Sequence, residues 1–270
     1  MYAFDYQRAS DAQGAVKALA ADADAKFLGG GQSLLAAMKL RLAQPTTLVD
    51  VTRIPELKAV QVDGKVVKVG AAVCHADVAE NAQIRNTLPA LADLAGMIGD
   101  RQVRALGTLG GSLANDDPAA DYPAAVLALN AVVVTDRRRI AADDFFLGMY
   151  ETALEPDELI VAVEFQVPER AAYEKFPNPA SHFALAGVFV AKYAGEAAGG
   201  PVRVAVTGAG PSVFRAGALE SALKTNFAPE AARAVKMPAD DLNTDLHASA
   251  AYRAHLIPVL AARAVAKANG

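Results

Sequence analysis

The stretches Gly29-Gly30-Gly31-Gln32-Ser33 and Thr108-Leu109-Gly110-Gly111-Ser112 are the most informative part of this chain. Each places consecutive glycines beside a small hydroxyl residue. Glycine adopts positive φ and lets the backbone approach a ligand closely, and successive N–H groups in such turns point into one concavity that suits a pyrophosphate. The second stretch is followed by Asn115 and by the acidic segment Asp116–Asp121, whose polar groups suit a ribose or a ring edge. Together the two stretches predict a dinucleotide held between two loops.

Taken singly, each glycine stretch has a plainer interpretation. Gly29–Ser33 is also a tight turn between a strand and a helix, and it matches neither the dinucleotide GxGxxG spacing nor a P-loop. Thr108–Ser112 is also a surface turn with a β-bulge, and Asp121 is a natural N-cap for a helix starting at Tyr122. Lys39 follows the first stretch and is a candidate to lend positive charge to a phosphate, although a solvated helix face is the alternative.

Composition excludes several classes of function. The 270 residues are 53% apolar with a net charge of −4, which argues against a nucleic-acid-binding protein. The single cysteine, Cys74, excludes a disulfide framework, a CxxC zinc site and an iron–sulfur cluster held within this chain. No export signal or membrane span is visible, so a soluble, cytoplasmic protein is expected. No catalytic Ser–His–Asp or Cys–His set can be argued from spacing, and the histidines lack partners at metal-binding spacing.

Hydrophobic periodicity predicts mixed helices and strands. Helices are expected from Ser10 or Asp11 through Leu19 and at 34–42, 75–81, 89–98, 122–129 and 247–268. Strands are expected at 26–28, 47–51, 132–134 and 159–163, in a hairpin over 60–69 with an Asp63-Gly64 turn, and in a pair, 187–193 and 202–207, around Gly199-Gly200-Pro201. The sequence pattern changes after Pro168, where a strand pair and then Ala-rich helices follow, and this change predicts a domain boundary near 165–175.

Four landmarks, in the expected order and nearly end to end, resemble the FAD-binding medium subunit of the molybdenum hydroxylases, the group of xanthine dehydrogenase and aerobic carbon monoxide dehydrogenase. The first runs from Gly29 to Leu35 and on through Met38–Leu42, Leu48–Val51 and Ile54–Leu57. The others are Thr108–Ala114 with Asp117–Asp121, then Tyr173–Phe176, and finally Gly208–Pro211. The pair of glycine stretches makes the resemblance specific.

The resemblance implies an α+β fold in two domains. Residues 1–168 would form a two-subdomain FAD-binding domain of the vanillyl-alcohol-oxidase (PCMH-like) kind, with subdomains of about 1–55 and 56–168. Residues 169–270 would form a C-terminal domain of a small antiparallel sheet and helices. FAD would lie extended between the two subdomains.

The resemblance also assigns site residues. Gly29, Gly30, Gly31, Gln32 and Ser33 would hold the pyrophosphate through backbone N–H groups, and Thr108, Gly110, Gly111 and Ser112 would clamp it from the other side. Asn115 and Asp121 match positions that contact the flavin or its ribose, and Lys175 matches a lysine near the flavin end. One departure is Arg104-Ala105-Leu106-Gly107, where the family often has Arg-Asn, so polar groups beside the second stretch are lost.

The function implied is electron relay, with no catalytic acid–base residues in this chain. Two [2Fe–2S] clusters on a small partner subunit would pass electrons through FAD to an external acceptor, and a large partner subunit would carry the molybdenum cofactor. The assembly implied is a dimer of heterotrimers, with no nucleic acid and no membrane span. Two alternatives stay open. One is a self-contained FAD oxidase or reductase using His75 or His182, and the other is a scaffold whose glycine stretches are only turns.

Overall fold

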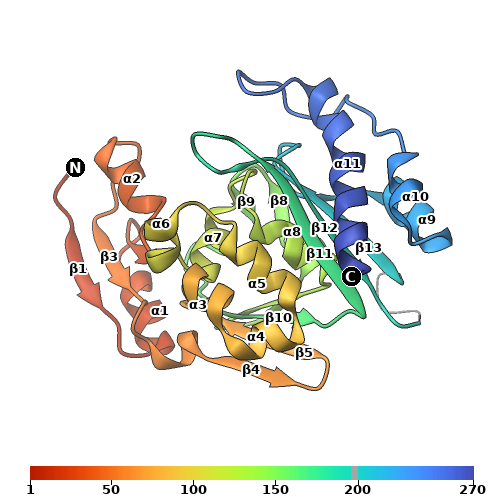
Figure 1. The fold of residues 1–270 in the computed structure, drawn as a ribbon. Coiled ribbons are helices and arrows are strands. Elements are labelled where there is room, and N and C mark those ends of the chain that lie inside the picture. Colours follow the sequence, from red (N-terminus) through yellow and green to blue (C-terminus); the bar gives the residue numbers. More distant parts are fainter. Residues whose placement is uncertain (196–199) are drawn as a thin grey trace.

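The structure is a computed structural model that describes residues 1–195 and 200–270. Helices and strands mix throughout, which confirms the α+β class. Figure 1 shows the N-terminal segment at one side, the middle of the chain in the centre and the C-terminal sheet and helices at the other side. The turn predicted at Gly199-Gly200-Pro201 falls partly outside the described residues.

The N-terminal unit is a small parallel sheet with strand order β1 (Asp5–Arg8), β3 (Thr47–Asp50), β2 (Lys26–Leu28). Helix α1 (Ala12–Ala20) is capped by Asp11, one of the two predicted cap residues, because the Asp11 carboxylate accepts from the N–H of Gly14 at 2.7 Å. Helix α2 (Leu34–Lys39) follows the first glycine stretch. It ends before the predicted residue 42, since Arg41 adopts a left-handed φ of 61°.

The middle unit is an antiparallel sheet covered by short helices. Its strand order is β4 (Val60–Asp63), β5 (Val66–Gly70), β10 (Ile160–Gln166), β6 (Val132–Thr135), β7 (Arg139–Ala141). The predicted Asp63-Gly64 hairpin is confirmed, with Gly64 at a φ of +55°. The remaining elements are η1 (Pro55–Lys58), α3 (His75–Glu80), α4 (Ala82–Thr87), α5 (Pro89–Gly96), α6 (Arg101–Leu106), α7 (Leu109–Asn115), α8 (Tyr122–Ala128), η2 (Ala142–Asp144), β8 (Phe146–Gly148) and β9 (Glu151–Thr152).

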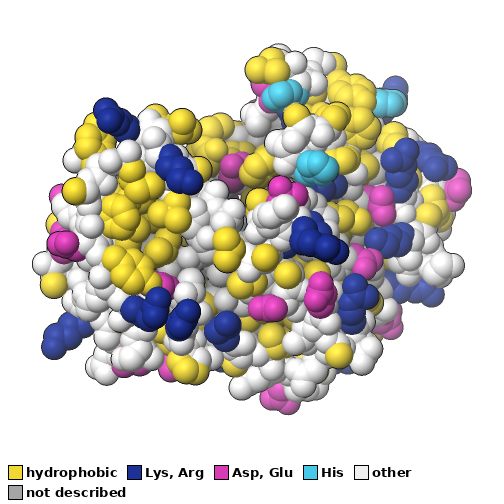
Figure 2. Space-filling model, turned by 60° about the vertical axis from the view of Figure 1, so that its left-hand side comes forward, with side chains coloured by type: hydrophobic (Ala, Val, Ile, Leu, Met, Phe, Trp, Pro, Cys, Tyr) yellow, Lys and Arg dark blue, Asp and Glu magenta, His cyan; other side chains and the backbone are white. Residues whose placement is uncertain are grey.

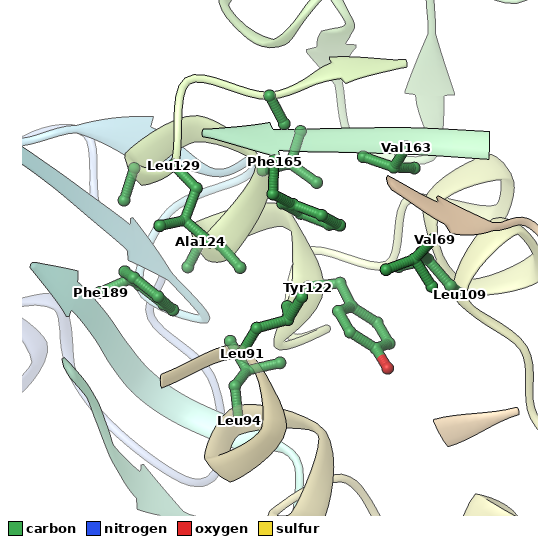
Figure 3. Packing of buried hydrophobic residues seen from close by; sticks show 14 of the residues in the cluster. Val69, Leu91, Leu94, Leu109, Tyr122, Ala124, Leu129, Val163, Phe165 and Phe189 are labelled. Atoms are coloured by element: carbon green, nitrogen blue, oxygen red, sulfur yellow. The ribbon is translucent and has the colours of Figure 1, made fainter. Parts of the chain in front are cut away.

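Helix α8 is buried along its whole length between two sheets. Figure 3 shows Ala124 of this helix near Phe165 of β10 and Phe189 of the C-terminal sheet, and all three belong to one hydrophobic core. This core takes in residues on both sides of the boundary predicted near 165–175, so the middle and C-terminal units pack as one body. The division at residue 168 stays a prediction.

The C-terminal unit is an antiparallel sheet, β11 (Arg170–Pro177), β12 (Ala184–Lys192), β13 (Val202–Thr207), β14 (Phe214–Arg215). Alternate residues of β12 enter different cores: Val188 and Val190 pack toward α11 (Ala250–Ala268), and Phe189 and Ala191 pack toward α8. Side chains alternate across a strand, so this strand, apolar throughout, is buried on both faces. Helices α9 (Gly217–Thr225) and α10 (Pro229–Arg233) complete the unit.

Three features of the C-terminal unit differ from the sequence prediction. Helix α11 starts at Ala250 and not at 247, because the Ser249 hydroxyl accepts from the N–H of Tyr252 at 3.2 Å and caps it. Strand β11 was not predicted, and β12 begins three residues earlier than the predicted 187–193. Within the part of the chain that the structure describes, no helix is long and apolar enough to cross a membrane.

Candidate functional site

One large cavity, of about 710 Å³, has walls from all three units. The N-terminal unit contributes the segment Lys26–Leu34, the middle unit contributes most of Gly107–Asp121, and the C-terminal unit contributes Ala180–Phe183. All of the predicted cofactor-binding residues line this cavity except Lys39 and Lys175. Lys39 is exposed on α2, away from the cavity.

The first glycine stretch presents unbonded donors to this cavity. It leaves the carboxyl end of β2, the edge of a parallel sheet where ligands commonly bind. Among the described residues, no hydrogen bond is donated by the backbone N–H of Gly30, Gly31, Gln32 or Ser33. The Gln32 side chain donates to the carbonyl of Gly30 at 3.2 Å and braces the turn. Consecutive free N–H groups in a turn form an anion site, so this stretch suits a pyrophosphate.

The second glycine stretch is the first turn of α7 and not a loop. Thr108 caps this helix, its Oγ1 accepting from the N–H of Gly111 at 3.1 Å. The N–H of Gly110 donates to the carbonyl of Ala71 at 2.8 Å, and that of Ser112 to the carbonyl of Thr108 at 3.0 Å. These N–H groups therefore have protein acceptors. The clamp that the resemblance assigns to Thr108, Gly110, Gly111 and Ser112 stays a prediction. The stretch still lines the cavity, together with the side chains of Thr108, Ser112 and Asn115. Contact between these side chains and a cofactor stays a prediction.

The glycines also let the two stretches touch. A Cβ on Gly29 would lie 2.8 Å from Thr108 Oγ1, and one on Gly30 would lie 1.9 Å from the carbonyl oxygen of Leu106. A Cβ on Gly110 would lie 2.6 Å from that of Ala71. No side chain fits at such separations, so close backbone contact explains these glycines at least as well as ligand contact. The cavity runs along the joint surface of the two stretches.

Asp121 corrects one sequence prediction. Helix α8 begins where predicted, but the Asp121 carboxylate does not cap it. The carboxylate instead accepts from the Tyr173 hydroxyl at 2.6 Å and pairs with Lys175 Nζ at 3.0 Å. Burial raises the pKa of Asp121, while the Lys175 ammonium and the Tyr173 hydroxyl act in the opposite direction. Lys175 has no place in the cavity lining and reaches the site through Asp121.

His75 lines the cavity and is only 5% exposed. Burial, and then the nearby charge of Arg104, lower its pKa to about 4, so the imidazole is neutral at pH 7. Its Nδ1 and the hydroxyl of Tyr122, whose ring centroid lies 5.3 Å away, are both buried without a hydrogen-bond partner among the described residues. A group with so low a pKa is a weak general base at neutral pH, which disfavours a self-contained oxidase that depends on His75.

Two aromatic side chains line the cavity where it meets solvent. Tyr150 is 59% exposed and Phe183 is 47% exposed. The Tyr150 hydroxyl donates to Asp117 at 3.3 Å, and its backbone N–H donates to the carbonyl of Asp116. Sequence reasoning missed both aromatics, because they lie in irregular segments with no hydrophobic period. A planar ring with access to solvent would find flat, apolar neighbours here.

Asp116 lies behind this part of the wall. It adopts a left-handed φ of 43°, and its Oδ2 is buried without a partner among the described residues. Burial, reinforced by the charge of Asp117, raises its pKa to about 7. The sequence showed the acidic segment but not this buried carboxyl.

The residues present fit FAD. The cavity offers free backbone donors for a pyrophosphate, hydroxyl and amide groups along its wall, and the exposed aromatic rings of Tyr150 and Phe183. Within residues 1–195 and 200–270, no group of three or more His, Cys, Asp or Glu side chains could hold a metal ion.

Comparison with known proteins agrees with this geometry. Residues 2–169 match the family described as the FAD binding domain in molybdopterin dehydrogenase. The chain is 39% identical to the carbon monoxide dehydrogenase medium chain of Hydrogenophaga pseudoflava over 82% of this chain and 83% of that one. It is 36% identical to the nicotine 6-hydroxylase medium subunit of Paenarthrobacter nicotinovorans, over 99% and 98% of the two chains.

Solved structures agree as well. A structure of the Hydrogenophaga pseudoflava carbon monoxide dehydrogenase, in a form lacking the Mo-pyranopterin moiety, superposes with a TM-score of 0.87 at 36% identity over 99% of this chain and 97% of that one. Quinoline 2-oxidoreductase from Pseudomonas putida 86 gives a TM-score of 0.87 at 27% identity, with the same coverage. The chain therefore belongs to the FAD-binding domain family of molybdopterin dehydrogenases and is an oxidoreductase component, the FAD-binding subunit of a molybdenum hydroxylase.

Proposed function

We propose that this chain relays electrons from two [2Fe–2S] clusters on a small partner subunit to an external acceptor, within a complex whose large subunit carries a molybdenum cofactor. The observation that carries this proposal is the cavity, lined by Gly30–Ser33, whose backbone N–H groups donate no hydrogen bond among the described residues. Bound FAD would supply the redox chemistry, exchanging electrons singly or in pairs. The single cysteine supports placing the clusters on another chain.

The residues of this chain bind and position the cofactor. Gly30–Ser33 would donate to the pyrophosphate, and the side chains of Thr108, Ser112 and Asn115 would contact the cofactor along the wall. Tyr150 and Phe183 would flank the ring at the opening, where an acceptor can approach. The neutral His75 would add no charge to the wall.

An exposed apolar patch supports a protein partner. The patch consists of Met1, Tyr2, Leu40 and Leu42, of which the two leucines are 71% and 79% exposed. Arg41 lies over the Tyr2 ring at 5.3 Å, which joins the N-terminus to the end of α2. Figure 2 shows hydrophobic side chains gathered at this side of the molecule. Such patches mark protein interfaces, and we propose the dimer of heterotrimers as the assembly.

The test is to purify this chain alone and co-expressed with candidate large and small subunits. We expect substrates of the kinds that name its relatives, such as carbon monoxide and N-heterocycles, to reduce the flavin only in the complex. Replacing Leu40 and Leu42 by Asp should abolish co-purification while the flavin stays bound. Leu246→Asp is the matched control, since Leu246 is 89% exposed far along the chain. Substrate oxidation by the isolated chain would contradict the relay and favour a self-contained oxidase.

A further inference from the structure

Lys175 joins three separate segments at the cavity wall through one ammonium group. Its Nζ donates to the carbonyl oxygens of Met97 at 2.8 Å and His182 at 2.9 Å, and it pairs with the carboxylate of Asp121 at 3.0 Å. The Lys175 and Asp121 side chains are 5% and 4% exposed. An ammonium has three N–H donors, so all of them are used inside the protein and none is left for a cofactor.

The segments that Lys175 joins lack regular secondary structure. Met97 leads into Ile98–Asp100, which line the cavity, and His182 lies in the lining segment Ala180–Phe183. Gly99 and His182 adopt left-handed φ values of 47° and 62°. Because neither segment belongs to a helix or sheet, the bonds to Lys175 are important in fixing where these walls lie.

The neighbouring Tyr173 strengthens this arrangement. It precedes Lys175 by two residues on β11, so both side chains leave the same face of the strand. The Tyr173 hydroxyl donates to Asp121 at 2.6 Å, and its ring stacks on Phe189 with centroids 6.1 Å apart. One strand of the C-terminal sheet thus holds Asp121 with two donors and sets the wall on the far side of the cavity from β2.

We propose that Lys175 is a positioning residue, which shapes the end of the FAD cavity formed by residues 98–100 and 180–183 without touching the cofactor. The inference rests on the binding of FAD in this cavity. The competing role is purely electrostatic, in which Lys175 only neutralises the buried charge of Asp121. The two roles differ in what happens when both charges are removed together.

The test compares Lys175→Met with the double variant Lys175→Met/Asp121→Asn in the full chain. The single variant leaves a buried carboxylate without its cation, which is strongly destabilising. The double variant removes that charge while keeping an amide that can accept from Tyr173, so its melting temperature should recover toward the wild-type value. The bonds to Met97 and His182 stay absent in both variants, so FAD should bind about tenfold more weakly to Lys175→Met than to the wild type, and about tenfold more weakly to the double variant than to Asp121→Asn, which keeps both bonds.

ADP is a second probe, since its phosphates need only the Gly30–Ser33 donors. We expect the affinity for ADP to stay unchanged in the double variant, whereas a general loss of structure would weaken the binding of ADP and of FAD alike. Lys267→Met is the matched control, because Lys267 pairs with Asp93 at 2.9 Å between α11 and α5 on the surface. Lys267→Met should change the affinity for neither FAD nor ADP. The positioning role would be overturned if the double variant bound FAD with wild-type affinity, or if it lost affinity for ADP as much as for FAD. Wild-type protein that fails to bind FAD would instead refute the cofactor assignment.

Discussion

At the residue scale, Gly30 shows why the first stretch needs glycine. Its missing Cβ leaves room for the backbone of Leu106 and Gly107, the latter with its Cα 2.5 Å from where that Cβ would lie. Its N–H belongs to the row of free donors in the cavity. One position therefore serves both the packing of the two stretches and the anion site.

We predict that Gly30→Ala separates the two stretches. Overpacking of this kind costs about 1–3 kcal/mol of unfolding free energy. Displacing the N–H donors should weaken the binding of FAD about tenfold or more. Fluorescence titration with FAD and urea unfolding measure the two effects. Gly217→Ala is the control, since a Cβ there meets nothing within 4 Å. A Gly30→Ala protein with wild-type FAD affinity would show that the stretch does not hold the cofactor.

His75 makes a second residue-scale prediction. The unfolded imidazole takes up a proton near pH 6.5, whereas the folded one does so only near pH 4. Between these values His75 binds more protons in the unfolded state, so its own contribution to stability falls by roughly 3 kcal/mol as the pH drops from 6.5 to 4. Asp116, whose pKa burial raises to about 7, acts in the opposite direction over this window.

Urea unfolding at a series of pH values checks this behaviour. His75→Gln should lose less stability than the wild type over the same window, since it has no proton to take up. His247→Gln, at an exposed position, should follow the wild type. Identical pH slopes for wild type and His75→Gln would mean that His75 is not buried in its neutral form.

At the element scale, the sequence predicted those elements whose signal lies within a few neighbouring residues. The Asp63-Gly64 hairpin and the Asp11 cap carry their whole signal within a few residues, and both are confirmed. Helix α6 carried such a signal too, since Asp100 caps it by accepting from the N–H of Val103 at 2.8 Å, yet it was missed. Strand β11 is different, because its sequence mixes small and charged residues and its neighbour β12 supplies the reason it is extended.

The site residues divide in the same way. Both glycine stretches can be recognised from the sequence alone, and both line the cavity. The partners of Asp121 could not be read locally, because Lys175 lies 54 residues away and only the pairing of β11 brings it there. The N–H bonds of α7 were equally hidden, since their acceptor at Ala71 depends on how the middle sheet packs.

At the scale of the whole molecule, the cavity exists because three units meet. The N-terminal sheet carries the free donors, and the middle unit packs α7 against them. The C-terminal unit contributes Ala180–Phe183 to the opposite wall and holds Asp121 of the middle unit through Lys175. Helix α8 joins the middle and C-terminal units through one continuous core. Changes in the C-terminal sheet should therefore reach the cofactor, although residues 2–169 alone match the FAD-binding family.

The most direct test of the account is the visible absorption spectrum of the purified full chain, followed by chromatography of the ligand that heating releases. We predict flavin bands and the release of FAD itself, with weaker bands in Gly30→Ala. A well-folded wild-type chain that stays colourless after incubation with excess FAD would contradict it.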